Sequence, residues 1–517
     1  MARGEFLYQR FVSCLDYEPT PCQDALLQGV GAFLTGEDSD IMVVNGYAGT
    51  GKTTAVSAVI EALGEMKVPC VLLAPTGRAA KVLSSYAGRP AYTIHKHIYR
   101  QKSVGSDGFG QFSLAPNKAH DTLFVVDEVS LIGFDTAERQ SSTIFGTGNL
   151  LEDLITFVRA GADNRLILVG DSAQLPPVGL DCSPALSPEF MEGFGGVTHA
   201  TLETVVRQAG ESGILHNATL LRERIAESSG DELFDDLKLE TDGFDDIERI
   251  SGGDLIEKVS DAYSRYGEDE TIVLCRSNKR AIRYNLGIRS TVQFKEERLV
   301  RGDKLMIVKN CYQFLENVKE LDYIANGDIA RLESIKHFED RYGLHFADAT
   351  LSFPDYGDIE ITAKVCLDTL ESESASLTYE QQNALYNGVS ADYADRGSKK
   401  KVWEAVREDK YFNALQLKYA DAVTAHKSQG GQWRCVFIDC PFWQEEQTLD
   451  DLKWLYTAIT RAVEKVYLVN LQNLIEKYLE QYQELQIEIT IQTVITFQYG
   501  INVLLNTKQK QKLHIMH

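Results

Sequence analysis

The stretch GYAGTGKTT at Gly46–Thr54 decides the fold class of this chain. It fits the pattern G-x-x-x-x-G-K-[ST] and lies between an apolar run at 41–44 and a helix-forming run, AVSAVIEAL, at 55–63. A buried strand, a glycine-rich turn and a helix N-terminus are the context in which a phosphate loop forms. Backbone N–H groups at the start of the helix attract an anion. The sequence therefore predicts an α/β domain that binds a nucleotide.

A second motif favours ATP hydrolysis over binding alone. Within the loop, Lys52 is expected to reach the β- and γ-phosphates of ATP, and the Thr53 hydroxyl to hold Mg²⁺. Another apolar run at 123–126 ends in Asp127 and Glu128. There, Asp127 is suited to hold Mg²⁺ and Glu128 to activate the attacking water. The expected nucleotide contacts of the loop are Gly46, Tyr47, Ala48, Gly49, Thr50, Gly51, Lys52, Thr53 and Thr54.

Three residues farther along the chain are candidates for sensing the γ-phosphate. Gln174 follows a third apolar run at 166–169. Arg207 lies in VVRQ and Arg461 in YTAITRA, where a second domain could bring a guanidinium to the developing negative charge. With Lys52 and Glu128, these residues form the expected catalytic set.

Composition indicates a multidomain globular protein of 517 residues. Its nine cysteines form no C-x-x-C pair, which argues against a zinc site or a disulfide framework. No run resembles a signal peptide or is apolar and long enough to cross a membrane. The sequence therefore predicts a cytoplasmic protein without a membrane partner.

The distribution of charge points to a nucleic-acid partner although the net charge is −23. Residues 66–106 include no Asp or Glu but seven Lys or Arg. In this window, LAPTGR at 73–78 suits contacts with backbone phosphates. His95 alone is more typical of a structural histidine, but its basic neighbours favour a DNA-facing loop. The acids gather instead at 227–254, which we interpret as a solvated surface insertion.

Together these segments resemble superfamily 1 helicases, specifically the 1B branch of the RecD and Dda types. The resemblance runs from about residue 20 to 470. Gln23 in TPCQDAL matches the adenine-reading glutamine of that family. The motifs I, Ia, Ib, II, III, IV, V and VI are matched by GYAGTGKTT, LAPTGRAA, TIHK, VVDEVSLI, GDSAQLPPVG, VVRQ, VTAHKSQG and YTAITRA.

This resemblance implies an α/β fold of two RecA-like P-loop NTPase lobes with ATP between them. A small β-hairpin would be inserted in the first lobe, and an SH3-like β-barrel with a helical arm in the second. The expected boundaries are 1–200 for the first lobe with its hairpin at 97–122, 201–297 and 421–471 for the second lobe, 298–420 for the barrel with its arm at 377–407, and 472–517 for a β-rich tail of unknown role.

The resemblance also implies a path for single-stranded DNA across both lobes, leading to a single/double-strand junction. In the hairpin, Phe109 or Phe112 would either separate the strands as a stacking pin or cover a loop. The expected DNA contacts are Pro75, Thr76, Gly77, Arg78, His95, Lys96, Thr424, His426, Lys427 and Ser428.

The implied activity is that of a monomeric, ATP-dependent DNA helicase that moves 5′→3′ as the lobes close and open. Two alternatives stay open at this point. One is a nucleotide-switched clamp or remodeler that binds DNA without unwinding it, and the other is a motor directed to RNA. In the tail, apolar residues alternate with mainly polar ones after Glu488, which is a strand pattern. The tail could be a docked hairpin, an assembly strand or a non-native extension.

Overall fold

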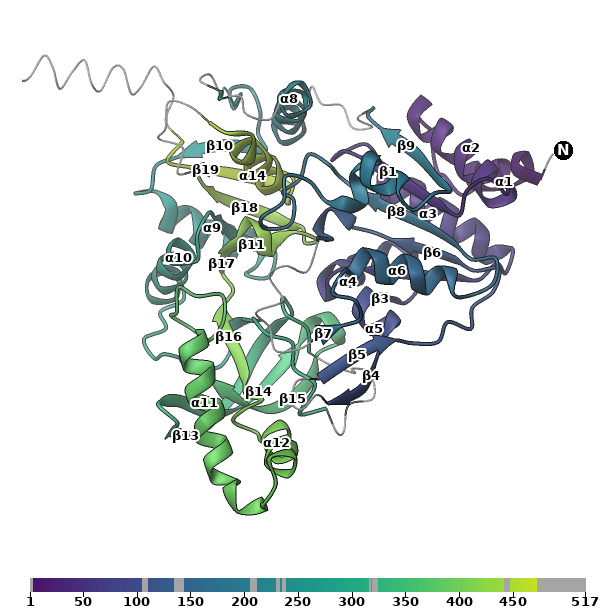
Figure 1. The fold of residues 1–517 in the computed structure, drawn as a ribbon. Coiled ribbons are helices and arrows are strands. Elements are labelled where there is room, and N and C mark those ends of the chain that lie inside the picture. The colour runs from purple at the N-terminus through teal and green to yellow at the C-terminus, as the bar shows by residue number, and fades with distance from the viewer. Residues whose placement is uncertain are drawn as a thin grey trace, which may run out of the picture. The chain divides into compact units, whose positions relative to one another are not determined.

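The computed structural model describes residues 3–104, 110–133, 144–204, 212–228, 233–234, 239–315, 318, 324–440 and 447–471. These residues form a six-stranded sheet, a five-stranded sheet, a closed barrel and a small three-stranded sheet (Figure 1). The predicted fold class, two α/β lobes with an inserted barrel, is confirmed. The strand pattern in the tail lies outside the described residues.

The first lobe is built on the six-stranded sheet, whose order is β3-β2-β6-β8-β1-β9. All its paired strands run parallel. Three of its strands, β1, β6 and β8, contain the apolar runs that the sequence predicted. The strands are β1 (Ile41–Gly46), β2 (Cys70–Ala74), β3 (Ala91–Thr93), β6 (Leu123–Val126), β8 (Arg165–Gly170) and β9 (Val197–Leu202).

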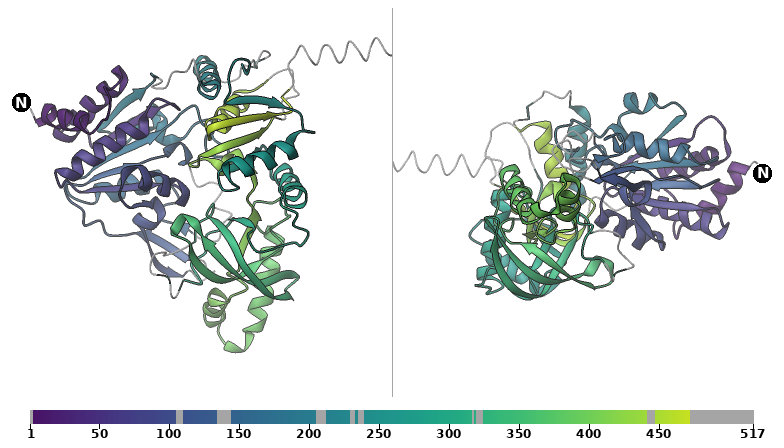
Figure 2. Two further views of the ribbon diagram at one scale, coloured as in Figure 1. Left: turned by 180° about the vertical axis from the view of Figure 1, so that it is seen from behind. Right: turned by 60° about the horizontal axis from the view of Figure 1, so that its bottom comes forward.

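The central strands are apolar because both faces of the sheet are covered. Ile41 and Val43 pack into one core with α6, while Met42 and Val44 pack into another with α2 and α3. The views in Figures 1 and 2 show helices on both sides of this sheet. The helices of the lobe are α1 (Arg3–Ser13), α2 (Pro21–Thr35), α3 (Lys52–Glu65), α4 (Gly77–Ala87), α5 (Ile94–Ile98), α6 (Leu150–Arg159) and α7 (Pro188–Glu192), with 3₁₀ turns η1 (Val129–Leu131) and η3 (Pro184–Leu186).

The hairpin insertion is smaller than the range that the sequence suggested. His97 belongs to helix α5, so the first hairpin strand begins only at Tyr99. A short third strand, which the sequence did not predict, pairs with the second. The strands are β4 (Tyr99–Val104), β5 (Gly110–Leu114) and β7 (Ile144–Phe145).

The second lobe is built on the five-stranded sheet, whose order is β10-β19-β18-β11-β17 and whose pairs are all parallel. Its chain is interrupted by the barrel between α10 and β17. The elements are α8 (Gly213–Glu227), β10 (Ile247–Ile250), α9 (Leu255–Tyr266), β11 (Thr271–Cys275), α10 (Asn278–Thr291), β17 (Ala422–Thr424), α13 (Ala425–Ser428), β18 (Trp433–Asp439), α14 (Leu449–Ile459) and β19 (Ala462–Val469).

The insertion in the second lobe is a closed five-stranded barrel with two helices before its last strand. The turn at Asn326-Gly327-Asp328 leads into its longest strand, and Gly327 has the positive φ of 95° that the turn requires. A capping box of Thr378 and Gln381 starts the first arm helix. The elements are β12 (Lys304–Ile307), β13 (Ile329–Arg341), β14 (Leu344–Phe353), η4 (Pro354–Tyr356), β15 (Ile359–Cys366), α11 (Tyr379–Asp392), η5 (Ala394–Arg396), α12 (Lys399–Glu408) and β16 (Leu415–Tyr419).

The helical arm consists of α11 and α12, which lie side by side (Figures 1 and 2). Leu385, Val389 and Trp403 of the arm pack against Phe346 of the barrel in one apolar cluster. This burial anchors the arm to the barrel. Among the described residues, no helix has the length and apolar character needed to cross a membrane.

Candidate functional site

The phosphate loop joins β1 to α3 and has the backbone that its glycines allow. Gly49 and Gly51 each have a φ of 75°, and Gly51 is the N-cap of α3. The Lys52 ammonium turns back onto the loop, where it donates to Gly46 O and, at 3.1 Å, to Tyr47 O. It also lies 3.8 Å from Asp171 Oδ2 at the end of β8. The loop therefore holds the lysine in place over its own carbonyl groups.

The carboxylates at the end of β6 lie next to this loop. Asp127 Oδ1 accepts from Glu128 N at 2.8 Å, and Asp127 Oδ2 accepts from the Tyr86 hydroxyl. Glu128 has a φ of 55°, a left-handed conformation that is uncommon outside glycine and recurs at functional sites. Burial raises the pKa of the Glu128 carboxyl, while the nearby charges of Arg461 and Lys52 oppose that shift. A raised pKa is typical of a catalytic base.

Gln23 lies against the back of the phosphate loop. Its side chain is fully buried, and its Oε1 accepts from Thr20 N at 3.1 Å in a capping box that starts α2. Its Nε2 donates to Thr50 O at 3.3 Å. The structure thus gives Gln23 a second role, because it ties the N-terminus of α2 to the loop.

Arg461 comes from the second lobe, just after the end of α14. It is 4% exposed, and its guanidinium donates only to neutral groups: Thr457 O at 3.1 Å, Gly431 O at 3.3 Å and Thr460 Oγ1 at 3.3 Å. No carboxylate of the described residues forms an ion pair with it. A buried cation without an anionic partner is costly unless a ligand supplies the anion. This arrangement suits a γ-phosphate.

Two residues of α14 that the sequence analysis did not single out connect the lobes at the nucleotide site. The Tyr456 hydroxyl donates to Asp171 Oδ2 at 2.7 Å and accepts from Ala48 N at 2.9 Å. Thr457 Oγ1 accepts from Leu175 N at 2.7 Å. Both residues precede Arg461 in YTAITRA, but nothing in that pattern tells a bridging hydroxyl from a core residue.

Gln174 lies in the same region, one residue before Leu175. Its side chain is buried, and its Oε1 has no hydrogen-bond partner among the described residues. The neighbouring Leu175 O accepts from Gln429 Nε2 of the second lobe at 2.7 Å. An unpartnered buried amide oxygen can accept a hydrogen bond from a donor such as a water molecule. Arg207 lies outside the described residues.

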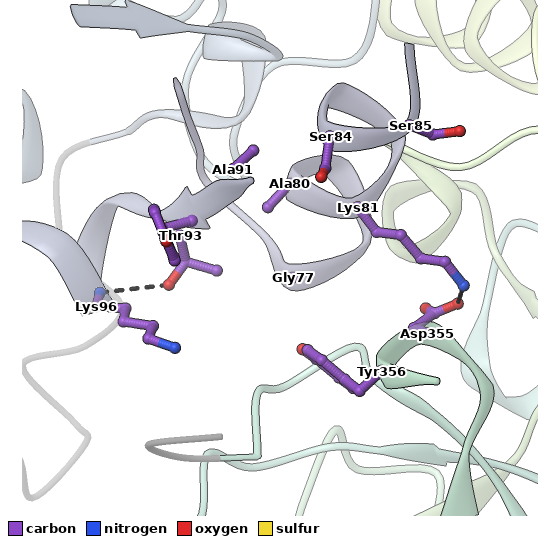
Figure 3. A pocket seen from close by; sticks show the side chains of 11 residues that line it. Gly77, Ala80, Lys81, Ser84, Ser85, Ala91, Thr93, Lys96, Asp355 and Tyr356 are labelled. Carbon is purple, nitrogen blue, oxygen red and sulfur yellow. Dashed lines mark hydrogen bonds and ion pairs between the residues drawn. The ribbon is translucent and has the colours of Figure 1, made fainter. Parts of the chain in front are cut away.

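A cavity of about 360 Å³ lies between the first lobe and the barrel (Figure 3). Lys81 of α4 crosses one side of it to an ion pair with Asp355 at 2.6 Å, and Lys96 and Thr93 lie on another side. The Lys96 ammonium lies 5.5 Å from the centre of the exposed Tyr92 ring. The cavity is lined by Gly77, Ala80, Lys81, Ser84, Ser85, Ala91, Tyr92, Thr93, Lys96, Asp355 and Tyr356.

The other predicted DNA contacts within residues 66–106 do not all reach this cavity. Thr76 caps α4 by accepting from Ala79 N at 3.2 Å, and Pro75 precedes it. Arg78 does not line the cavity but lies over the Trp433 ring of the second lobe, 4.0 Å from its centre. His95 packs against Tyr99 and Phe145, and burial lowers its pKa to about 4. The imidazole is therefore neutral at physiological pH and adds no charge for a phosphate.

The predicted contacts of VTAHKSQG surround the short helix α13 in the second lobe. Thr424 is its N-cap, and Ser428 is fully buried with its hydroxyl bonded to Ala425 O at 2.7 Å. Burial lowers the pKa values of His426 and Lys427. The partly buried Lys427 is the cation that this segment offers to a phosphate.

Of the two pin candidates, Phe112 is described and Phe109 lies outside the described residues. The Phe112 ring stacks on Phe145 at 4.5 Å and lies 5.6 Å from Tyr312 of the barrel insertion. Phe112 is partly buried against the first-lobe core. These contacts hold the base of the hairpin.

The turn at 325–328 connects the barrel to the first lobe beside the cavity. The buried Asp328 carboxylate accepts from Ala325 N at 2.7 Å and from the Tyr356 hydroxyl at 3.0 Å. A Cβ on Gly77 would lie 2.7 Å from Asp328 Oδ1 and 2.8 Å from that hydroxyl, so a larger residue would displace these side chains.

We expect Asp328→Asn to flatten the pH dependence of stability. Burial raises the pKa of Asp328 to about 7, above the value near 4 of an unfolded chain. The protonated group thus contributes stability that is complete below about pH 4 and is lost as the pH rises to about 7, by about 1.4 kcal/mol for each pH unit in this interval. Denaturant titrations at about pH 5 and about pH 8 should show a larger loss for wild type than for Asp328→Asn. The exposed Asp358→Asn is the control, and equal losses in all three proteins would contradict the expectation.

Comparisons with known proteins place a match on each lobe. A family model described as an AAA domain matches residues 28–233, and one described as a UvrD-like helicase C-terminal domain matches residues 419–469. The chain is 33% identical over 203 residues to the ATP-dependent RecD2 DNA helicase of Deinococcus radiodurans, which covers 39% of this chain and 24% of that protein. It is 37% identical over 93 residues to the ATP-dependent DNA helicase Dda of Enterobacteria phage T4, which covers 17% of this chain and 21% of that one.

Two further similarities extend over most of the chain. An uncharacterized protein of Methanocaldococcus jannaschii is 26% identical over 475 residues, covering 84% of this chain and 37% of that protein. The crystal structure of a Bacteroides Pif1 helicase in complex with ADP-AlF3 and ssDNA aligns with a TM-score of 0.41 and 16% identity, covering 91% of this chain and 98% of that one. The chain thus spans less than two fifths of the length of each of the three curated relatives. The family models on both lobes and the RecD2 and Dda relatives show that this chain is similar to superfamily 1B helicases in both lobes.

Proposed function

We propose that this protein is an ATP-dependent DNA helicase that translocates 5′→3′ on single-stranded DNA and unwinds duplex DNA as a monomer. The observation that carries the proposal is the meeting of two lobes at one nucleotide site. Lys52 and Glu128 come from the first lobe, while Arg461 and the Tyr456 bridge come from the second. The RecD2 and Dda relatives, both named ATP-dependent DNA helicases, support this assignment.

In this proposal the residues of the site divide the work of hydrolysis. The phosphate loop and Gln23 bind ATP, Glu128 accepts a proton from the attacking water, and Arg461 stabilises the charge that develops on the γ-phosphate. Gln174 and Arg207 sense the same phosphate. Thr53 and Asp127 fit Mg²⁺, because Thr53 is exposed beside the loop and both residues offer oxygen donors. When bound, the ion would neutralise part of the phosphate charge.

The same contacts explain how hydrolysis would drive movement. Tyr456 and Thr457 join the second lobe to Ala48, Asp171 and Leu175 of the first, beside the loop that would hold the γ-phosphate. Loss of that phosphate removes the anion that holds Arg461, so the lobes separate. The DNA strand would then be held alternately by two sites. One is the cavity with Lys81 and Lys96, and the other is Lys427 of the second lobe.

Strand separation on duplexes with either a 5′ or a 3′ single-stranded tail tests the proposal. We expect unwinding only from the 5′ tail and none with Lys52→Ala, because that variant cannot bind the β- and γ-phosphates. Unwinding only from the 3′ tail would contradict the direction. DNA-stimulated ATP hydrolysis without unwinding from either tail would favour a clamp or remodeler, and stronger stimulation by single-stranded RNA would favour an RNA-directed motor.

A further inference from the structure

Trp433, the first residue of β18, carries the stacked Arg78 described above. Its side chain is 2% exposed, and its indole N–H has no hydrogen-bond partner among the described residues. Arg78 is the second residue of α4, next to the Thr76 cap. None of the described residues gives the Arg78 guanidinium a hydrogen bond or an ion pair, although the charge of Asp355 acts on it from a greater distance, and the guanidinium stacks on Trp433. A guanidinium over a buried indole is attracted by the ring.

The backbone of Trp433 is bonded directly to the arginine of the nucleotide site. Trp433 N donates to Arg461 O at 2.9 Å, and the Arg461 guanidinium donates to Gly431 O at 3.3 Å. The segment 431–433 is therefore held by Arg461 at both ends. One of these hydrogen bonds reaches the Arg461 backbone and the other its guanidinium, so the segment contacts both parts of the residue.

Two glycines let α4 approach this segment closely. A Cβ on Gly431 would lie 2.5 Å from Arg78 Nε and 2.7 Å from the Trp433 ring. A Cβ on Gly430 would lie 2.8 Å from the Ala79 Cβ, and Gly430 has a φ of 73°. A Cβ at either position would fit only if a neighbouring group shifted. The α4 N-terminus and the segment 431–433 are thus in close contact.

We propose that Trp433 is a positioning residue. Through it, the binding of DNA at the N-terminus of α4 changes the position of Arg461. The inference rests on the proposed function and names a route by which DNA would stimulate hydrolysis. A phosphodiester bound at 76–78 gives Arg78 an anionic partner and shifts it on the Trp433 ring. The segment 431–433 follows because it is packed against Arg78, and Arg461 moves with it.

The test compares the full-length chain with its variants by the ratio of the ATPase rate with oligo-dT to the rate without it. We expect Trp433→Leu to lower this ratio roughly 3- to 30-fold, the range that a partly to fully buried cation–π contact would give. Trp433→Phe keeps an aromatic face and should retain most of the ratio. The matched control is Tyr266→Leu, which removes another aromatic ring of the same lobe that carries a stacked arginine, Arg434 at 5.1 Å.

A double-mutant cycle separates coupling from a general loss of packing. Arg78→Gln should lower the ratio as Trp433→Leu does, and the double variant should be no worse than either, because both remove one contact. A cooperatively folded Trp433→Leu with the wild-type ratio would overturn the inference. If Trp433→Leu does not fold, an unchanged ratio in Arg78→Gln would overturn it.

Tryptophan fluorescence separates this inference from the proposed function. Among the four tryptophans, the signal of Trp433 is the difference between wild type and Trp433→Phe. We expect oligo-dT to change the Trp433 signal when Arg78 is present. In the Arg78→Gln background, measured in the same way with and without Trp433→Phe, the Trp433 signal should not respond. Wild-type protein that hydrolyses no ATP would contradict the proposed function. A Trp433 signal that does not respond to bound oligo-dT would contradict the inference alone.

Discussion

Replacing Arg461 by alanine is expected to lower the kcat of ATP hydrolysis by about 10³-fold, the lower end of the effect of an arginine finger. The guanidinium is buried and donates only to Thr457 O, Gly431 O and Thr460 Oγ1, so its positive charge is available to the γ-phosphate. Arg461→Lys should also be strongly impaired, because an ammonium lacks the planar fork of donors. Binding of a fluorescent ATP analogue should change far less than kcat, since the charge develops in the transition state.

The control for this prediction is Arg434→Ala. Arg434 lies in the same lobe but is exposed, and its guanidinium pairs with Glu464 at 2.6 Å. A steady-state assay at saturating single-stranded DNA should show wild-type kcat for this control. If Arg461→Ala kept kcat within about threefold of wild type while remaining folded, Arg461 could not be the residue that stabilises the transition state.

Replacing Glu128 by glutamine is expected to lower kcat by about 10²- to 10⁴-fold, the usual contribution of a general base. The amide has the same shape as the carboxyl but cannot accept the proton of the attacking water. Single-turnover hydrolysis should be slow while ATP binding persists. The exposed Glu152→Gln, in the first turn of α6, is the matched control.

The pH dependence of the wild-type rate offers a second check on Glu128. Because burial raises its pKa, a fraction of the carboxyl is protonated at a pH where an exposed glutamate is ionised. As the pH falls, the Glu128 carboxylate is therefore protonated at a higher pH than an exposed glutamate. The acidic decrease in kcat should accordingly begin at a pH above the titration range of an ordinary glutamate. An acidic limb at the usual glutamate range, or one retained by Glu128→Gln, would argue against this role.

The parts of the site that sequence predicts are those set by local pattern. The loop at Gly46–Thr54 and the carboxylates after β6 follow apolar runs, and a parallel strand buried on both faces shows as such a run. Asp127 and Glu128 then lie near Lys52, because β6 and β1 both pair with β8 and end at the same edge of the sheet. The barrel and its arm were predicted from the family resemblance, with the capping box at Thr378 marking the start of α11.

The contacts between lobes could not be predicted in this way. Tyr456 and Trp433 are aromatic residues in apolar surroundings, and as sequence both are typical of a core. Their partners, Asp171 and Arg78, lie far away along the chain, and only the packing of the two sheets brings each pair together. Periodicity describes which side of an element is buried, but not which other element covers it. The same limit explains why the sequence indicates only a DNA contact for Arg78.

The internal bonds of Lys52 also bear on how often the enzyme can turn over. Its ammonium is held by Gly46 O and Tyr47 O and lies 3.8 Å from Asp171. The phosphates of a nucleotide must replace these carbonyl groups as partners of Lys52. The observed affinity for the nucleotide is therefore the intrinsic affinity multiplied by the fraction of molecules in which Lys52 is released. In the proposed function, the same carbonyl groups would compete for the lysine after hydrolysis and favour the departure of ADP. The internal bonds of Lys52 would thus lower the affinity for nucleotide and favour release of the product.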